Sequence, residues 1–167
     1  MQLRFLKVTG LTKYKLLLIA IIIIFSGFGV KLLLPTKIVD VHYLEGYKKR
    51  YYIIVENFPI TDSGKKNWWK NNKNTLAEKY GIPVGKEDFD ITFWISEYQD
   101  GSYRSRGNGD LICFDDMKVK ANCIDKENRP LQISYYYNQH KTMFHYNQEN
   151  ILHYENDQTG ESYKLRF

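Results

Sequence analysis

The longest apolar run of the chain lies near its start, at residues 16–34. It contains a single charge, Lys31, close to one end. As an α-helix this run would extend about 28 Å, close to the ~30 Å hydrocarbon core of a bilayer, and Lys31 could carry its ammonium group to the interface. The pattern therefore predicts a transmembrane helix over residues 16–34.

Charges before the apolar run set its predicted orientation. Arg4, Lys7, Lys13 and Lys15 precede the run and no acidic residue does. Because short basic flanks stay in the cytoplasm, we expect a cytoplasmic tail at 1–15, an uncleaved anchor at 16–34, and the rest of the chain outside the cytoplasm. A cleaved signal peptide and a buried core segment are the alternatives, although no Ala-x-Ala cleavage site follows the run.

Beyond Pro35, short apolar segments separated by turn residues predict strands. Residues 38–43 alternate between apolar and polar side chains, which is typical of a half-buried strand. Residues 51–55 are apolar almost throughout, as in a central strand covered on both faces. A hairpin between the two is the simplest pairing.

One soluble helix is predicted over residues 63–80. Residues 61–63 supply three candidate N-caps, while Gly81 and Pro83 supply a stop. Helical spacing gives a narrow stripe facing the sheet, formed by Trp68 or Trp69 with Asn72, Leu76 and Tyr80. The remaining surface is rich in lysine, with Lys65, Lys66, Lys70, Lys73 and Lys79.

Further strands are expected after the helix. They are residues 90–96, a hairpin around the two cysteines, and residues 131–137, 142–146, 151–154 and 163–167. The order of elements predicts an α+β fold, in which a mainly antiparallel sheet packs on one helix. Gly107 and Gly109 are interpreted as part of a turn, because a phosphate-binding loop would need a helix behind it.

The two cysteines, Cys113 and Cys123, lie ten residues apart on the predicted hairpin. In an oxidising compartment they would form a disulfide that contributes about 2 to 3 kcal/mol. Reduced core thiols, or half of a metal site whose other ligands are not evident, remain as alternatives.

The excess of positive charge lies entirely before residue 35. Five of the 24 Lys and Arg residues, and none of the 19 Asp and Glu residues, precede residue 35, so the remainder is neutral despite the net charge of +5. A nucleic-acid partner is therefore not expected. Aromatic residues make up 16% of the chain, which favours a fold rich in sheet.

No familiar catalytic motif is present: the chain lacks a Gly-x-Ser-x-Gly elbow, a His-Glu-x-x-His pair and a P-loop. His140, His145 and His153, with Asp157 nearby, come closest to a ligand cluster, but their spacing does not place them on one face of a strand. We expect no enzymatic activity, no metal and no cofactor.

Five segments are distinctive in combination: residues 57–65, Trp68-Trp69, residues 79–83, residues 92–94, and residues 113–117 with Cys123. Together with the apolar run they resemble the enterobacterial putative membrane proteins grouped as domain of unknown function 943, over roughly residues 16–130. The resemblance implies a single-pass inner-membrane protein with a periplasmic domain, which would occupy residues 35–167. That family has no defined catalytic residues to carry over.

Two functional hypotheses follow. The first is a tethered periplasmic protein-binding module, such as an immunity factor that neutralises a delivered toxin. Abundant tyrosine favours it, since tyrosine is enriched at interfaces. Its candidate contacts are Trp68 and Trp69, which otherwise belong to the core, and Asp115 and Asp116, which otherwise form a solvated turn.

The second hypothesis is an envelope accessory protein. Such a protein would bind lipid headgroups or glycan, or would be a subunit of an inner-membrane complex, and the lysine-rich helix and aromatic C-terminal segment motivate it. A hydrolytic role would rest only on the histidines of that segment.

Overall fold

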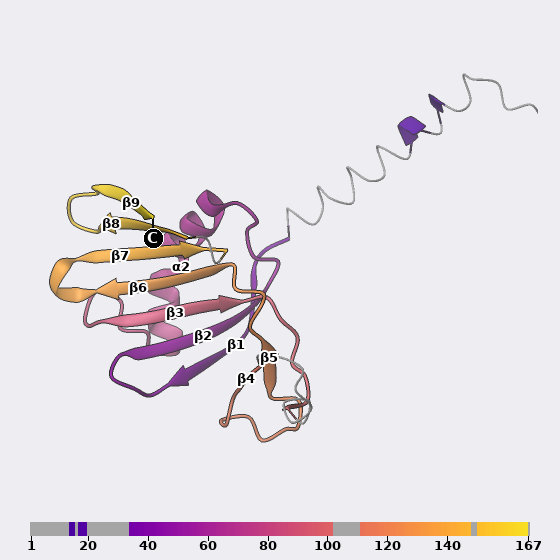
Figure 1. Ribbon diagram of the computed structural model, residues 1–167, viewed down its shortest axis with the longest axis horizontal. Coiled ribbons are helices and arrows are strands. Elements are labelled where there is room, and N and C mark those ends of the chain that lie inside the picture. The colour runs from indigo at the N-terminus through magenta and orange to yellow at the C-terminus, as the bar shows by residue number, and fades with distance from the viewer. Residues whose placement is uncertain (1–13, 16, 20–33, 102–110, 148–149, 167) are drawn as a thin grey trace, which may run out of the picture. The chain divides into compact units, whose positions relative to one another are not determined.

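The computed structural model describes residues 14–15, 17–19, 34–101, 111–147 and 150–166 (Figure 1). The chain divides into two compact units, Met1–Pro35 and Thr36–Phe167. The second unit is built around a seven-stranded sheet with the strand order β1-β2-β3-β6-β7-β8-β9. The strands of this sheet are β1 (Lys37–Leu44), β2 (Lys49–Glu56), β3 (Phe89–Trp94), β6 (Leu131–Tyr136), β7 (Lys141–Tyr146), β8 (Ile151–Asn156) and β9 (Ser162–Arg166).

Neighbouring strands of the sheet run antiparallel except for β2 and β3, which run parallel. A parallel pair needs a long crossover, and α2 (Asp62–Tyr80) provides it. From β6 onward the chain is a meander, with a short 3₁₀ turn, η2 (Tyr137–Gln139), between β6 and β7. The predicted α+β fold and the predicted order of elements are confirmed for this unit.

Local sequence signals set both ends of α2. The hydroxyl of Thr61 accepts a hydrogen bond from the Gly64 amide at 3.1 Å, so Thr61 is the N-cap among the three candidates. Gly81 ends the helix in the left-handed conformation, with φ of 68°, where a residue with a Cβ would be strained. The predicted boundaries are therefore correct to within one residue.

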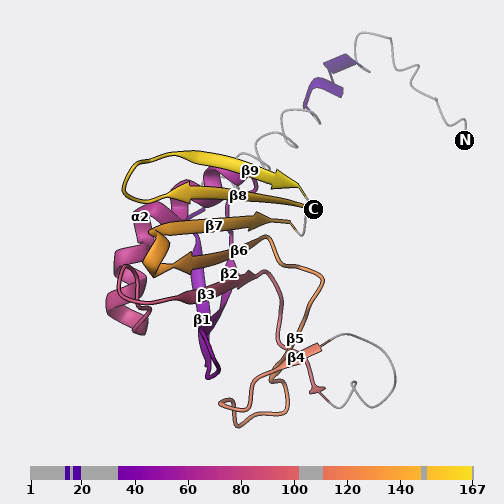
Figure 2. The ribbon, with the colours of Figure 1, turned by 60° about the vertical axis from the view of Figure 1, so that its left-hand side comes forward.

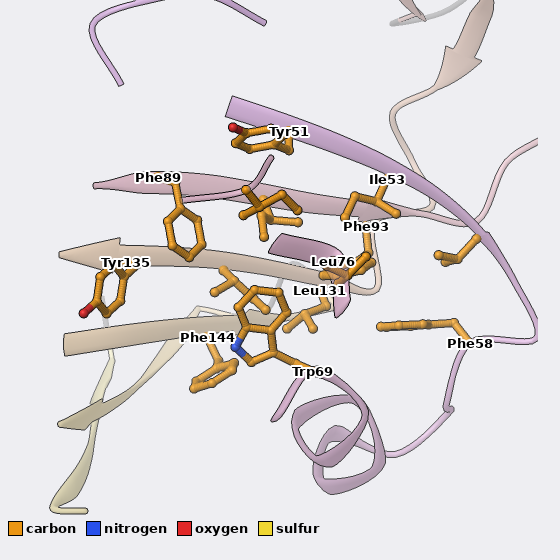
Figure 3. Close-up of a cluster of buried hydrophobic side chains, with 14 of the residues drawn as sticks. Tyr51, Ile53, Phe58, Trp69, Leu76, Phe89, Phe93, Leu131, Tyr135 and Phe144 are labelled. Atoms are coloured by element: carbon orange, nitrogen blue, oxygen red, sulfur yellow. The ribbon is translucent and has the colours of Figure 1, made fainter. Parts of the chain in front are cut away.

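The main core lies between α2 and one face of the sheet. In Figure 1 the helix passes behind the strands, and Figure 3 shows Trp69 and Leu76 of α2 among Phe89, Leu131 and Phe144 of the sheet. All five side chains are at most 2% exposed. Burial of this size supplies most of the driving force for folding, at about 1.5–3 kcal/mol for each large apolar side chain.

The helical pattern predicts Lys65 on the exposed surface of α2, but the structure buries this side chain. Its side chain is only 1% exposed, and its ammonium group contacts the side-chain oxygens of Asp62 and Asn147. The first turn of α2 lies close to the end of β7, so the lysine stem packs inward while Asp62 compensates its charge.

The cysteine hairpin forms a separate two-stranded sheet of β4 (Leu111–Cys113) and β5 (Cys123–Asp125), set apart from the large sheet in Figures 1 and 2. The predicted disulfide between Cys113 and Cys123 is present. A second hydrophobic cluster joins Phe114 and Ile124 of this hairpin region to Ile54 and Trp94 of the large sheet. Because side chains alternate along a strand, this cluster lies on the face opposite α2.

The two clusters explain the apolar run in β2. Ile53 belongs to the core under α2, whereas Ile54 belongs to the cluster under the cysteine hairpin. Both residues are at most 1% exposed. The prediction of a strand covered on both faces is confirmed.

Candidate binding face of the sheet

The face of the sheet opposite α2 carries a group of aromatic and apolar side chains on β6 to β9. Strand pairing places Met143 beside Tyr154, Tyr154 beside Tyr163, and Leu152 beside Leu165. Tyr163 and Leu165 are about half exposed, at 50% and 51%. We call the surface formed by Tyr136, Met143, Tyr154, Tyr163 and Leu165 the open face.

Stacking and cations hold the tyrosines of the open face in place. The rings of Tyr154 and Tyr163 stack with centroids 4.8 Å apart, and the ammonium group of Lys141 lies 5.7 and 5.5 Å from them. Burial, with the nearby charge of Asp90, raises the pKa of the Tyr136 hydroxyl. The stacked pair and Tyr136 therefore give this surface both aromatic area and hydroxyl groups.

A hollow of about 390 Å³ lies on the same face of the sheet, nearer the cysteine hairpin. Its polar lining is mainly cationic and its walls include two aromatic rings. The residues around it are Arg50, Tyr52, Asp90, Thr92, Trp94, Ile112, Lys126, Arg129 and Gln132.

A buried histidine ties the cysteine hairpin region to β1. His42 is 2% exposed, its Nδ1 lies 2.9 Å from a carboxylate oxygen of Asp116, and its Nε2 lies 2.6 Å from the hydroxyl of Tyr98. Its ring stacks on Phe114 with centroids 3.6 Å apart. Burial and the carboxylate of Asp40 raise the pKa of Tyr98, so its hydroxyl stays protonated at neutral pH. These contacts of the enclosed imidazole join β1 to the cysteine hairpin region.

The predicted contact residues lie in different parts of the fold. Asp116 is the partner of His42, whereas Asp115 beside it is exposed. Trp69 lies in the core under α2 and is 2% exposed. Trp68 is half-buried and meets Phe58 and Phe93 edge-on, with ring centroids 5.3 and 5.6 Å away. A role for any of the four in binding stays a prediction.

The histidines of the C-terminal segment do not converge. His153 pairs with Phe144 across β7 and β8, while His145 pairs with Leu152, which puts the two imidazoles on opposite faces of the sheet. His140 occupies the turn after η2. The described residues contain no group of His, Cys, Asp and Glu side chains able to hold a metal ion.

Glu155 of β8 joins the sheet to α2 through Lys66 and Lys70, which both contact its carboxylate. Burial alone would raise the pKa of Glu155, but hydrogen bonds and charge from the two lysines outweigh it, so the pKa lies below its ordinary value of 4.5. The lysine-rich surface of the predicted helix is thus partly used in packing.

Sequence reasoning missed His42, Lys65, Glu155 and the cationic hollow. The alternating pattern of β1 does put Asp40 and His42 on one face, yet nothing local indicates that Asp116, 74 residues away, covers that face. Arg50 and Arg129 also come from segments far apart in the sequence, so no local motif predicts the hollow.

Comparison with known proteins identifies one family. The model of the family described as "Enterobacterial putative membrane protein (DUF943)" matches residues 10–166, so the match extends through β7, β8 and β9, beyond the expected end near residue 130. No curated protein and no solved structure matches the chain.

Part of the predicted anchor falls outside the described residues, namely residue 16 and residues 20–33. No helix in the described part of the chain combines the length and hydropathy that a bilayer crossing requires.

Proposed function

We propose that this chain, which belongs to the DUF943 family of enterobacterial putative membrane proteins, is a membrane-associated module. Its open face binds another protein. The observation that carries this proposal is the contrast between the two faces of the sheet. One face is occupied by α2, while the opposite face presents tyrosines, a methionine and a leucine on β6 to β9.

Three features support placement of the folded unit at the periplasmic side of the inner membrane. The apolar run at 16–34 follows basic residues, which favours a cytoplasmic N-terminus. Leu17, Leu18 and Ile19 are helical and more than half exposed, at 59%, 57% and 53%. The disulfide fits an oxidising compartment.

The chemistry of the open face favours a protein over a small molecule as its ligand. Tyrosine and methionine are enriched at protein interfaces, where rigid aromatic rings give a large contact area for little loss of conformational entropy. The surface extends over four adjacent strands, about 14 Å across at the usual strand spacing. A globular partner covers such a broad surface better than a small ligand does.

A variant of the exposed Tyr163 tests this proposal. Tyr163→Glu puts a charge on the open face at the edge strand β9, and Tyr47→Glu makes the same change in the fully exposed β1–β2 turn. After crosslinking in membranes, the wild type and Tyr47→Glu should retain the same co-purifying protein, while Tyr163→Glu should lose at least nine-tenths of it. Equal recovery with both variants, or no specific protein with the wild type, would refute the proposal.

The finer proposal is that the partner is a toxin delivered by a competing cell and that the chain is an immunity factor. An inhibitor held at the membrane meets such a toxin where it enters. Cells that express the chain should survive a toxin encoded beside its gene, and survival should depend on Tyr163 but not on Tyr47. Absence of a toxin-like neighbouring gene together with absence of protection would count against this role.

The envelope accessory role remains as the second candidate, and the cationic hollow favours it. Lys65 no longer supports it because this lysine is buried, and Lys66 and Lys70 bind Glu155. Any recognition of anionic lipid or glycan would therefore be expected at the hollow, on the opposite side of the sheet from α2.

A further inference from the structure

We propose that the hollow beside Trp94 is a binding site for an oxyanion group, a carboxylate or a phosphate, carried by a small soluble molecule or by an anionic lipid headgroup. This inference does not depend on the protein-binding role of the open face. It rests on the charges, the unpaired donor and the size of the hollow.

The two arginines of the hollow are not neutralised by any carboxylate that the structure describes. Arg50 and Arg129 form no ion pair with any residue that the structure describes, and the guanidinium group of Arg129 donates only to the neutral Gln132, at 3.0 Å. Asp90 is the one carboxylate in the lining, and it already accepts from Lys48 at 3.0 Å and from Ser134. The hollow therefore carries an excess of positive charge.

Guanidinium groups suit an oxyanion because their planar donors can form paired hydrogen bonds with carboxylate or phosphate oxygens. Arg50 comes from β2, whereas Arg129 lies two residues before the start of β6, and both line the same hollow. Both arginines are therefore available to an anion that enters the hollow.

Trp94 supplies an independent observation. It lines the hollow, is 4% exposed, and its indole N–H has no hydrogen-bond partner among the described residues. A buried donor without an acceptor costs about 1–3 kcal/mol, which an acceptor atom of a ligand would recover. Tyr52 meets Trp94 edge-on, with ring centroids 6.0 Å apart, so an apolar wall stands beside the charges.

The size of the hollow fits a small ligand. A volume of about 390 Å³ lies within the range typical of small-molecule sites, about 300–1,000 Å³. The mixture of an aromatic wall and cationic donors matches an acidic group attached to a compact organic body.

The test uses the full chain in nanodiscs and three probes: inorganic phosphate, succinate, and phosphatidylglycerol added to a phosphatidylcholine disc. Binding is followed by calorimetry and by intrinsic fluorescence. We expect saturable binding of at least one probe, weakened at least tenfold in Arg50→Gln and in Arg129→Gln. The matched control Arg166→Gln removes an exposed arginine of β9 and should bind as the wild type does.

The three arms distinguish the source of the anion. Saturation by phosphate or succinate in neutral discs indicates a soluble ligand, whereas saturation only with phosphatidylglycerol indicates a headgroup. Trp94→Phe, which keeps an aromatic ring but removes the N–H donor, should weaken binding about threefold to tenfold, and a cooperative thermal unfolding transition checks that the variant is folded. Failure of all three probes to saturate, or equally weakened binding in Arg166→Gln, would overturn the proposed site. Neither outcome would change the co-purification result for Tyr163.

Discussion

Three buried or half-buried ionisable side chains hold distant parts of the fold together. His42 joins β1 to Asp116, Lys65 joins the start of α2 to Asn147 after β7, and Glu155 joins β8 to α2. Each pairs with a group of complementary chemistry, as a charged or titratable group must when it leaves water. They give the domain specific long-range links in addition to its apolar core.

Glu155 gives a prediction of pH dependence. Its pKa is lowered in the folded protein, so its contribution to stability is complete above the unfolded value of 4.5 and is lost as the pH falls through the folded value. At pH 7, Glu155→Gln should lower the free energy of unfolding by about 1 kcal/mol, because two charge-assisted contacts to partly exposed lysines are weakened.

Denaturant unfolding from pH 7 to pH 2.5 checks this expectation. The difference between wild type and Glu155→Gln should shrink below pH 4.5 and vanish once the folded protein is protonated at this site. Glu161→Gln, an exposed acid in the turn before β9, should show no such difference. A gap between wild type and Glu155→Gln that stays constant down to pH 2.5 would show that the lysine contacts do not stabilise the fold.

At the scale of elements, the cysteine hairpin is a small appended sheet that depends on its disulfide. β4 and β5 contain three residues each, too few to be stable as an isolated hairpin. The disulfide, the stacking of His42 on Phe114 and the cluster around Ile124 hold the pair against the large sheet. Gly101 fits closely there, because a Cβ at this position would lie 2.6 Å from the sulfur of Cys123.

Removal of the disulfide should therefore destabilise the domain. The double variant Cys113→Ser with Cys123→Ser should lose about 2–3 kcal/mol of unfolding free energy, by the entropy of closing the ten-residue separation between them. Addition of reductant should lower the stability of the wild type by a similar amount and leave the double variant unchanged. If reductant destabilised both proteins equally, the loss of stability would not come from the Cys113–Cys123 disulfide.

Local signals made most elements predictable from the sequence. Thr61 and Gly81 bound α2, and the alternation of β1 and the continuous apolar run of β2 indicate one strand half-buried and one buried on both faces. What could not be predicted depends on tertiary contacts: the burial of Lys65 needs Asn147, and the role of Asp116 needs His42. The position of the cysteine hairpin on the far face of the sheet follows from no local pattern either.

In the whole molecule, a folded unit of residues 36–167 follows an apolar segment. α2 and the main core give the unit its stability, while the opposite face carries the open face and the cationic hollow. The proposed immunity role and the persistence of the disulfide both require this unit to lie outside the cytoplasm. The compartment of the folded unit is therefore the property to measure.

Paired reporter fusions after Arg166 measure that compartment most directly. Alkaline phosphatase, which is active only after export, should be active in the fusion, and a green fluorescent protein that folds only in the cytoplasm should stay dark. Fusions placed after Lys15, before the apolar run, should give the reverse result and serve as the control. A fluorescent, phosphatase-inactive pair of fusions after Arg166 would contradict the account.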